Sequence, residues 1–140
     1  MPDVHLRPLL ESDEPAVFEM MRDPAAVRMA AFTARDPDDR EAFAAHFQRL
    51  RTDPAVTALA VEADGALVGT VGAFDMEGER EVTYWIDRRH WGRGLATAAL
   101  AQLLERESVR PIAARAAAAN GASLHVLHRA GFEEVLLLLR

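Results

Sequence analysis

Residues 85–97 read Trp-Ile-Asp-Arg-Arg-His-Trp-Gly-Arg-Gly-Leu-Ala-Thr, and no other segment constrains the structure of this chain as strongly. A strand ends here, a basic loop with two glycines follows, and a helix begins at Leu95. Gly92 and Gly94 let the backbone approach an anion, and the first N–H groups of a helix have no partner within it. The helix dipole adds partial positive charge, so the segment predicts a phosphate-binding loop. P-loop and dinucleotide-binding proteins use the same arrangement, so the flanking sequence must identify the ligand.

Length and composition indicate one globular domain over residues 1–140, with 50% apolar and 27% charged residues. No apolar run approaches the ~18 residues of a membrane span, and the N-terminus lacks the apolar core of a signal peptide. We therefore expect a cytoplasmic protein with no membrane partner. The net charge of −6 argues against a nucleic-acid surface. The absence of cysteine excludes disulfides, thiolate metal sites and cysteine nucleophiles.

The first third of the chain predicts one strand and two helices. Residues 4–9 form a short strand, and Asp13 caps a helix that ends near Asp23. A second helix over 37–51 follows from apolar residues recurring at helical spacing. The segment 25–34 between the helices has no clear period, and we consider it a candidate mobile cover over a site.

The rest of the chain predicts an antiparallel meander followed by alternating helices and strands. Strands over 56–62, 66–74 and 81–87 are joined by turns at Asp64-Gly65 and Glu77-Gly78. A helix over 95–106 and a strand over 111–116 come next. Asn120 then caps a helix that ends before Gly131, and Phe132 starts a last strand.

This order of elements predicts an α/β (α+β) fold around a mixed, mostly antiparallel central sheet. The strand ending at Asp87 connects through the glycine-loop helix to the strand near Ile112, and this connection looks like the one parallel crossover. The anion site therefore lies at the one parallel pair, which is unlike a doubly wound fold. Flanking helices number about four.

Three motifs resemble those of the GCN5-related N-acetyltransferases. Trp91-x-x-Gly94-x-Ala96 matches the family pattern Arg/Gln-x-x-Gly-x-Gly/Ala, with tryptophan first as in the ribosomal-protein alanine acetyltransferase-like branch. The segment from Asn120-x-x-Ser123 to Gly131-Phe132 and the hairpin around Asp64-Gly65 are the other two. The resemblance covers nearly the whole chain. It implies a sheet of six to seven strands whose parallel pair splays apart, and acetyl-CoA as cosubstrate without a metal.

The resemblance also implies where acetyl-CoA binds. Backbone N–H groups of the loop would receive its pyrophosphate, from residues Gly92, Arg93, Gly94, Leu95, Ala96 and Thr97. The pantetheine arm would insert like an extra strand along the backbone of Tyr84, Trp85 and Ile86, because its amides need partners when buried. Asn120 would bind the arm or hold the splay open. A backbone N–H near Trp85 would stabilise the oxyanion.

Catalysis by such a protein needs a base, because a protonated amine cannot attack a thioester. Glu81 is our candidate, since it stands near the family's usual base position; the alternative is a solvated glutamate at a strand end. Arg115 occupies the place of a second base that the family sometimes uses, and Leu127 that of its acid tyrosine. Ser123 is the nearest replacement for the acid; the alternatives are that Ser123 is a surface residue and that the departing thiolate of CoA needs no acid.

The predicted function is therefore acetyl transfer from acetyl-CoA to a primary amine, either a protein N-terminus or a small molecule. The alternative is a non-catalytic acyl-CoA sensor or interaction module. A nicotinamide-dependent oxidoreductase is disfavoured, because Ile112, Ala113 and Ala114 stand where an acidic residue is needed. His125 and His128 share a helix face but lack a third ligand nearby, so we expect no metal site. A homodimer through the last strands is an open alternative.

The C-terminal end departs from the family pattern. Relatives end in a hairpin, yet residues 132–140 contain no turn residue. We expect loop residues to be missing between Val135 and Leu136; the alternatives are an absent or swapped last strand.

Overall fold

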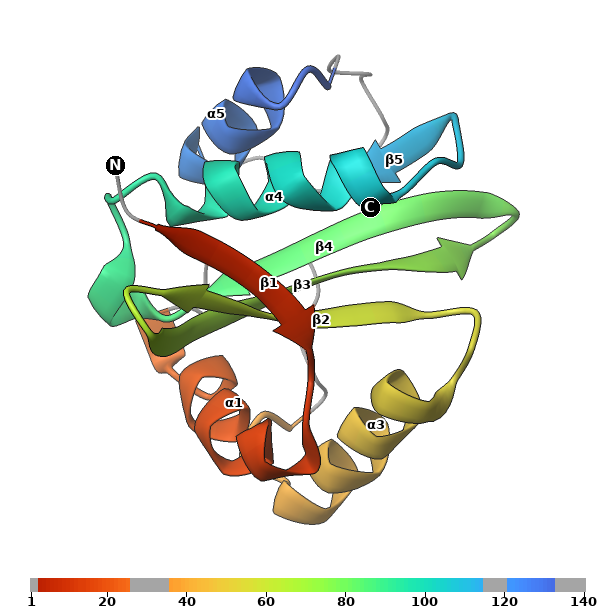
Figure 1. Ribbon diagram of the computed structural model, residues 1–140. Coiled ribbons are helices and arrows are strands. Elements are labelled where there is room, and N and C mark those ends of the chain that lie inside the picture. The colour runs from red at the N-terminus through yellow and green to blue at the C-terminus, as the bar shows by residue number, and fades with distance from the viewer. Residues whose placement is uncertain (1–2, 26–35, 115–120, 133–140) are drawn as a thin grey trace.

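The computed structural model describes residues 3–25, 36–114 and 121–132, without the side chains of 121–123. Its strands are β1 (Val4–Pro8), β2 (Thr57–Ala63), β3 (Ala66–Met76), β4 (Glu79–Ile86) and β5 (Ile112–Ala114). They form one sheet in the order β1-β2-β3-β4-β5 (Figure 1). Neighbours from β1 to β4 run antiparallel, and β5 runs parallel to β4. The mixed sheet with one parallel pair is confirmed.

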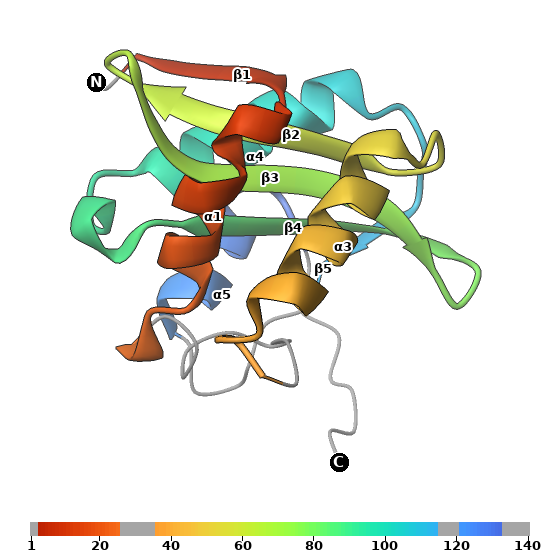
Figure 2. The same cartoon turned by 90° about the horizontal axis from the view of Figure 1, so that it is seen from below.

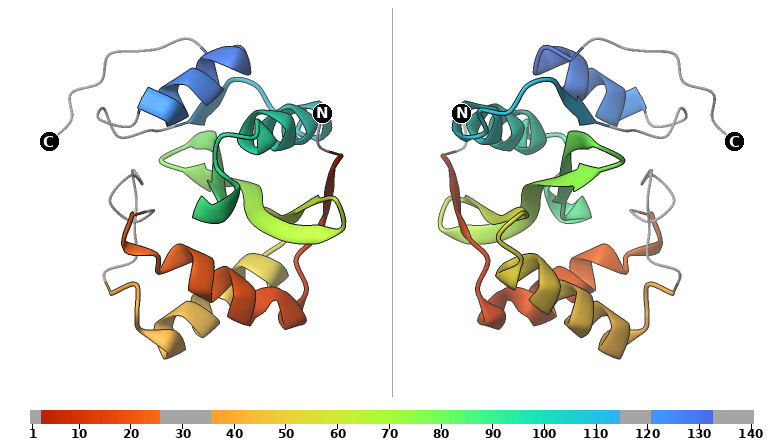
Figure 3. Two further views of the ribbon diagram at one scale, coloured as in Figure 1. Left: turned by 90° about the vertical axis from the view of Figure 1, so that its left-hand side faces the viewer. Right: turned by 90° about the vertical axis from the view of Figure 1, so that its right-hand side faces the viewer.

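Helices cover both faces of the sheet. On one face lie α1 (Glu14–Met21) and α3 (Arg40–Thr52); on the other lie α4 (Leu95–Arg106) and α5 (Gly121–Arg129) (Figures 1 and 2). Figure 3 shows the three layers from the side, with the sheet between the helical pairs. The described residues contain five strands rather than six or seven, because the strand expected after Phe132 lies outside them.

Two separate apolar clusters hold the layers together. The larger lies between the sheet and α4, which packs against β1, β3 and β4 and whose Leu95, Leu100 and Leu103 are almost completely buried. The smaller lies under α1 and α3, around Val17 and Phe47. Burying a side chain of this size stabilises the fold by roughly 1.5–3 kcal/mol. The helices are therefore fixed to the sheet mainly by one apolar face each.

Several predicted boundaries are confirmed by their local geometry. Asp64 and Gly65 both have positive φ (52° and 82°), as a type I′ hairpin turn requires. Gly131, at φ 98°, follows α5. Its N–H donates to the His128 carbonyl and the Phe132 N–H donates to the Leu127 carbonyl, which is the Schellman ending.

Two expectations about the first helices need correction. Asp13 precedes α1 but makes no side-chain capping bond to it. Its carboxylate instead accepts from Arg7 at 2.8 and 3.0 Å and from the Leu10 N–H at 2.8 Å. The second helix begins at Arg40 rather than Pro37, because the Asp39 carboxylate caps it by accepting from the Ala42 N–H.

The outer strand β1 has part of its open edge covered by α4. Gln102 donates to the Val4 carbonyl at 2.7 Å, and Arg106 donates to the Leu6 carbonyl at 3.3 Å. Pro8, two residues further along the same edge, has no N–H to offer. These features blunt an edge that could otherwise pair with another strand.

Candidate functional site

The strands β4 and β5 pair over only a short distance. Their register joins Arg80 to Ile112, Glu81 to Ala113 and Val82 to Ala114. β4 continues beyond this point to Ile86, while the described part of β5 ends at Ala114. Within the described residues, the second half of β4 therefore has no β5 partner.

The backbone alternation of β4 decides which of its groups face that side. The Asp87 N–H donates to the Val68 carbonyl of β3 at 2.8 Å, and the β3–β4 register is continuous. The main-chain N–H and C=O groups of odd-numbered β4 residues thus point toward β3, and those of even-numbered residues point away from it. The main chains of Tyr84 and Ile86 point toward the β5 side, whereas that of Trp85 points toward β3. The Ile86 carbonyl accepts from the Trp91 indole N–H at 2.8 Å.

The glycine loop connects the end of β4 to α4. Gly92 has φ 82°, and Gly94, at φ 74° and ψ 14°, is the N-cap of α4. A Cβ at either position would meet no other atom within 4 Å, so both glycines border open space. The cap has no side chain, and the first helical N–H groups, from Leu95, Ala96 and Thr97, have no acceptors within α4. The left-handed glycines and the first turn of α4 therefore lie together at the end of β4.

Each arginine of this loop is paired with a carboxylate. Arg88 bonds to Asp23 at 2.7 Å, Arg89 to Asp87 at 2.7 Å and Arg93 to Asp64 at 3.2 Å. Hydrogen bonding from the Arg89 guanidinium is the main reason why the pKa of Asp87 is lowered. Sequence reasoning missed these pairs, because two of them join residues far apart in the chain. The loop's positive side chains therefore already have partners, and its main-chain N–H groups become the more important anion donors.

Glu81 lies on the opposite side of the sheet from α4. Val82 and Ile86 belong to the α4 cluster, so the alternating residues Glu81, Thr83 and Trp85 face α1 and α3. The Trp85 indole confirms this direction by donating to the Met20 carbonyl of α1 at 3.2 Å. Glu81 is only 3% exposed, whereas Thr83 is exposed. The sequence alternative of a solvated strand-end glutamate is therefore wrong.

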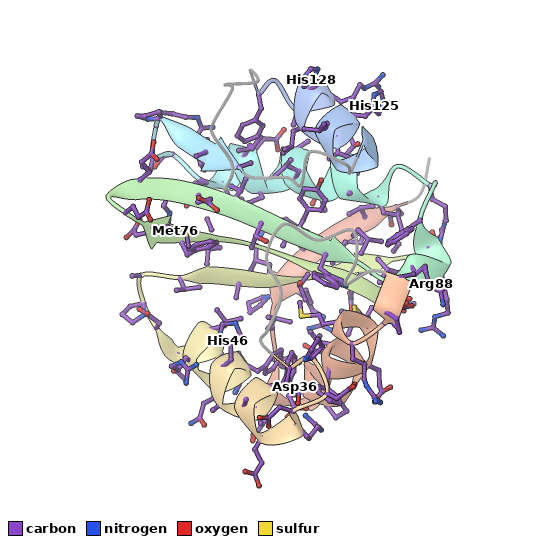
Figure 4. All side chains as sticks on the ribbon, turned by 180° about the vertical axis from the view of Figure 1, so that it is seen from behind. Asp36, His46, Met76, Arg88, His125 and His128 are labelled. Carbon is purple, nitrogen blue, oxygen red and sulfur yellow. The ribbon has the colours of Figure 1, made fainter. Side chains whose placement is uncertain are left out.

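A hollow of about 390 Å³ lies at the C-terminal end of α1, beside the glycine loop. Figure 4 shows Arg88 next to this end of α1. The lining contains three carboxylates and two guanidinium groups, from Glu19, Arg22, Asp23, Pro24, Asp38 and Arg88. The excess of carboxylates favours a cationic or neutral occupant.

Other predicted site residues lie partly or wholly outside the described residues. Asn120 and the Ser123 side chain are among them, as are residues 26–34 of the predicted cover 25–34 and the Val135–Leu136 junction. The described part of α5 begins at Gly121. His125 and His128 project from α5 in Figure 4. No group of three or more potential metal ligands was found among the described residues.

Comparisons with known proteins agree with this geometry. Residues 3–133 match the model of an acetyltransferase (GNAT) domain. A solved chimera of spermidine N-acetyltransferase SpeG from Vibrio cholerae and hSSAT superposes with a TM-score of 0.80 at 18% identity, covering 94% of this chain and 81% of that one. The RimL ribosomal alpha-N-protein acetyltransferase in complex with coenzyme A gives 0.77 at 20% identity, covering 92% and 79%.

Aminoglycoside acetyltransferase AAC(6')-Ib, also solved with coenzyme A, gives a TM-score of 0.77 at 17% identity, covering 94% of this chain and 84% of that one. At these identities the structural matches establish the fold alone. No curated protein sequence matches the chain. No helix among the described residues has the length and apolar character of a membrane span.

Proposed function

Because this chain belongs to the GNAT acetyltransferase family, we propose that it transfers the acetyl group of acetyl-CoA to a primary amine by direct attack on the thioester. The acceptor is a protein N-terminus or a small molecule. The observation that carries the proposal is the junction of two features: β4 runs past its last pair with the described part of β5, directly into a loop with left-handed Gly92 and Gly94 at the start of α4. One extended ligand can use both.

The two halves of the junction suit two parts of acetyl-CoA. The main-chain N–H groups of residues 92–97 bind the diphosphate, where the helix dipole adds favourable charge. The pantetheine arm lies along β4, where the outward main chains of Tyr84 and Ile86 run beside it and the Trp85 indole holds the strand to α1. On the β5 side, Asn120 binds the arm or holds the two strands apart. An arm that pairs with a strand edge in this way satisfies its own amides.

The chemistry then needs a proton acceptor on the amine side. Glu81 is a buried carboxylate on the sheet face that α1 and α3 cover, and it pairs with Ala113, one residue before the last described β4–β5 pair. It takes the proton of the acceptor's ammonium, directly or through a water, and the neutral amine attacks the thioester carbonyl. An outward main-chain N–H of β4 stabilises the developing oxyanion. The thiolate of CoA leaves, with Ser123 as the candidate donor of its proton.

The acceptor reaches the thioester from the side of α1 and the hollow beside it. Three carboxylates against two guanidinium groups favour a cation there, as an ammonium acceptor is before it loses its proton. The solved structures named above are acetyltransferases of an aminoglycoside, of spermidine and of a ribosomal protein. Trp91 at the start of the glycine motif favours the ribosomal-protein alanine acetyltransferase-like branch. We propose that residues 1–140 act as one such domain in the cytoplasm.

The test is thiol release from acetyl-CoA with a panel of amines. The panel combines peptides with different N-terminal residues, polyamines and aminoglycosides, and product masses identify the acetylated group. We expect amine-dependent release of CoA with at least one class. Binding of acetyl-CoA without release over the whole panel would instead support the sensor alternative.

A further inference from the structure

Trp91 combines a main-chain hydrogen bond with a largely exposed ring. Its indole N–H donates to the Ile86 carbonyl at 2.8 Å. The residue is nevertheless 46% exposed, and the other large apolar residues so exposed in the described chain, Leu10 and Val109, are aliphatic. The N–H edge of this indole is hydrogen-bonded, whereas its apolar ring face is open. Tryptophan can use such a free face to contact an apolar part of a ligand.

The bonded carbonyl is the last one on the outward edge of β4. The main-chain groups of the even-numbered residues of this strand point toward the β5 side, and Ile86 is the final strand residue before the loop. Trp91 therefore holds the place where the strand edge ends and the glycine loop begins. Any ligand that binds both the outward edge of β4 and the glycine loop must pass Trp91.

The chemistry of acyl-CoA matches that passage. Between its diphosphate and the first amide of its arm lies a short carbon segment that bears two methyl groups and, next to the amide, one hydroxyl. With the diphosphate on the loop and the amides on β4, this segment falls beside Trp91. The two methyl groups gain nothing from a backbone acceptor such as the Ile86 carbonyl, but they gain from contact with an aromatic face.

We propose that Trp91 is a positioning residue for acyl-CoA. Its N–H occupies the Ile86 carbonyl, so the amides of the arm pair with β4 only before this residue. Its exposed face packs against the dimethyl segment. Together these contacts fix how far the thioester extends along β4 toward Glu81. The inference rests on the proposed function, because it requires acyl-CoA as the ligand.

A purely structural role for Trp91 makes a different prediction. If the indole only fastened the loop to β4, its loss would disturb the diphosphate site as well. The two roles therefore separate when a ligand with the arm is compared with a ligand that has the diphosphate alone. Acetyl-CoA and 3′-phospho-ADP form this pair.

The experiment measures the affinity of both ligands by calorimetry for the wild type and for Trp91→Phe and Trp91→Ala. Trp91→Phe removes the N–H and keeps a ring; we expect acetyl-CoA to bind about three- to tenfold more weakly. Trp91→Ala also removes the apolar face, and a further loss of about tenfold is expected. The affinity for 3′-phospho-ADP should stay within about twofold for Trp91→Phe. In turnover, KM for acetyl-CoA should rise more than kcat falls.

Three outcomes overturn the inference. Equal losses for both ligands would make Trp91 a loop fastener only, and unchanged acetyl-CoA affinity would leave it no role in binding. A wild-type protein that fails to bind acetyl-CoA would remove the proposed function itself, and this result is visible before any variant is compared. Should Trp91→Ala fail to fold, Trp91→Phe still decides. The emission of wild-type tryptophan should also shift to shorter wavelength with acetyl-CoA, and Trp91→Phe should lose that shift.

Discussion

Gly94 shows how one residue serves the fold and the ligand together. Its φ of 74° is left-handed, and a Cβ there would meet no protein atom within 4 Å. In the protein without ligand, a side chain at this position therefore costs only the backbone strain, about 1–2 kcal/mol. Any further cost must come from a ligand that approaches the same space, which makes this position a direct probe of the loop.

We predict that Gly94→Ala weakens acetyl-CoA binding by at least about tenfold, or 1.4 kcal/mol. Gly78→Ala is the matched control, because Gly78 has φ 82° and equally open surroundings in the turn before β4. Both variants should lose similar free energy of unfolding in urea. Only the first should lose affinity by calorimetry, and equal affinities would contradict the loop assignment.

Glu81 is the second residue whose placement leads to a prediction. Glu81→Gln keeps the size of this buried side chain and removes its basicity. We predict that kcat falls by about a hundredfold or more, while the dissociation constant of acetyl-CoA changes by less than about twofold. Glu79→Gln is the control, since Glu79 lies on the same side of β4 but is exposed. Normal turnover by Glu81→Gln would exclude this residue as the base.

At the scale of elements, the connection between β1 and α1 depends on an ion pair. The Arg7 side chain on β1 donates to both Asp13 carboxylate oxygens, and Asp13 is only 8% exposed. Hydrogen bonding from Arg7 is the largest cause of the lowered pKa of Asp13. A carboxyl with a lowered folded-state pKa stabilises the fold above its unfolded pKa, and this contribution disappears as the pH falls through the folded value.

We predict that Asp13→Asn lowers the free energy of unfolding at pH 7 by about 1.5–3 kcal/mol. The difference between wild type and variant should begin to shrink below about pH 4, where the carboxyl is protonated in the unfolded chain, and should fade as the pH falls through its lower folded-state pKa. Urea unfolding of wild type and variant between pH 7 and 3 measures this difference in the free energy of unfolding. Asp38→Asn, which removes an exposed partner of Arg22, should change stability far less. A difference that is constant with pH would mean that the Asp13 charge is not its source.

Elements that carry their own local signals could be predicted from the sequence, and those set by distant partners could not. Leu95 to Arg106 was predicted to be a helix and is α4, because a glycine cap and an apolar face mark it locally. Asp13 has the residue type of a cap, yet Arg7 takes its carboxylate. The glycine loop was likewise visible in sequence. Its link to α1 was not, because Asp23 and Arg88 are 65 positions apart.

At the scale of the whole molecule, the candidate site draws on both helical layers. The glycine loop leads into α4, the Arg88–Asp23 pair joins the loop to the end of α1, and Trp85 bonds to the Met20 carbonyl. A ligand bound at the junction therefore contacts segments that are held together only in the folded chain. Binding should then oppose global unfolding.

We predict that acetyl-CoA at a hundred times its dissociation constant stabilises the protein by about 2.7 kcal/mol. A thermal melt should shift upward with acetyl-CoA and remain unchanged with NAD or ATP at the same concentration. ATP carries phosphates but no pantetheine arm, so it tests whether the loop alone suffices. An equal shift with all three would indicate a general phosphate site.

The covered border of β1 has a consequence for self-association. Side chains of Gln102 and Arg106 hold the Val4 and Leu6 carbonyls, so strand addition from another copy is opposed at this border. Polymerisation by edge pairing requires two receptive borders on every subunit. A molecule with one border partly covered is a poor unit for such a chain, so growth into a fibre by edge pairing is disfavoured.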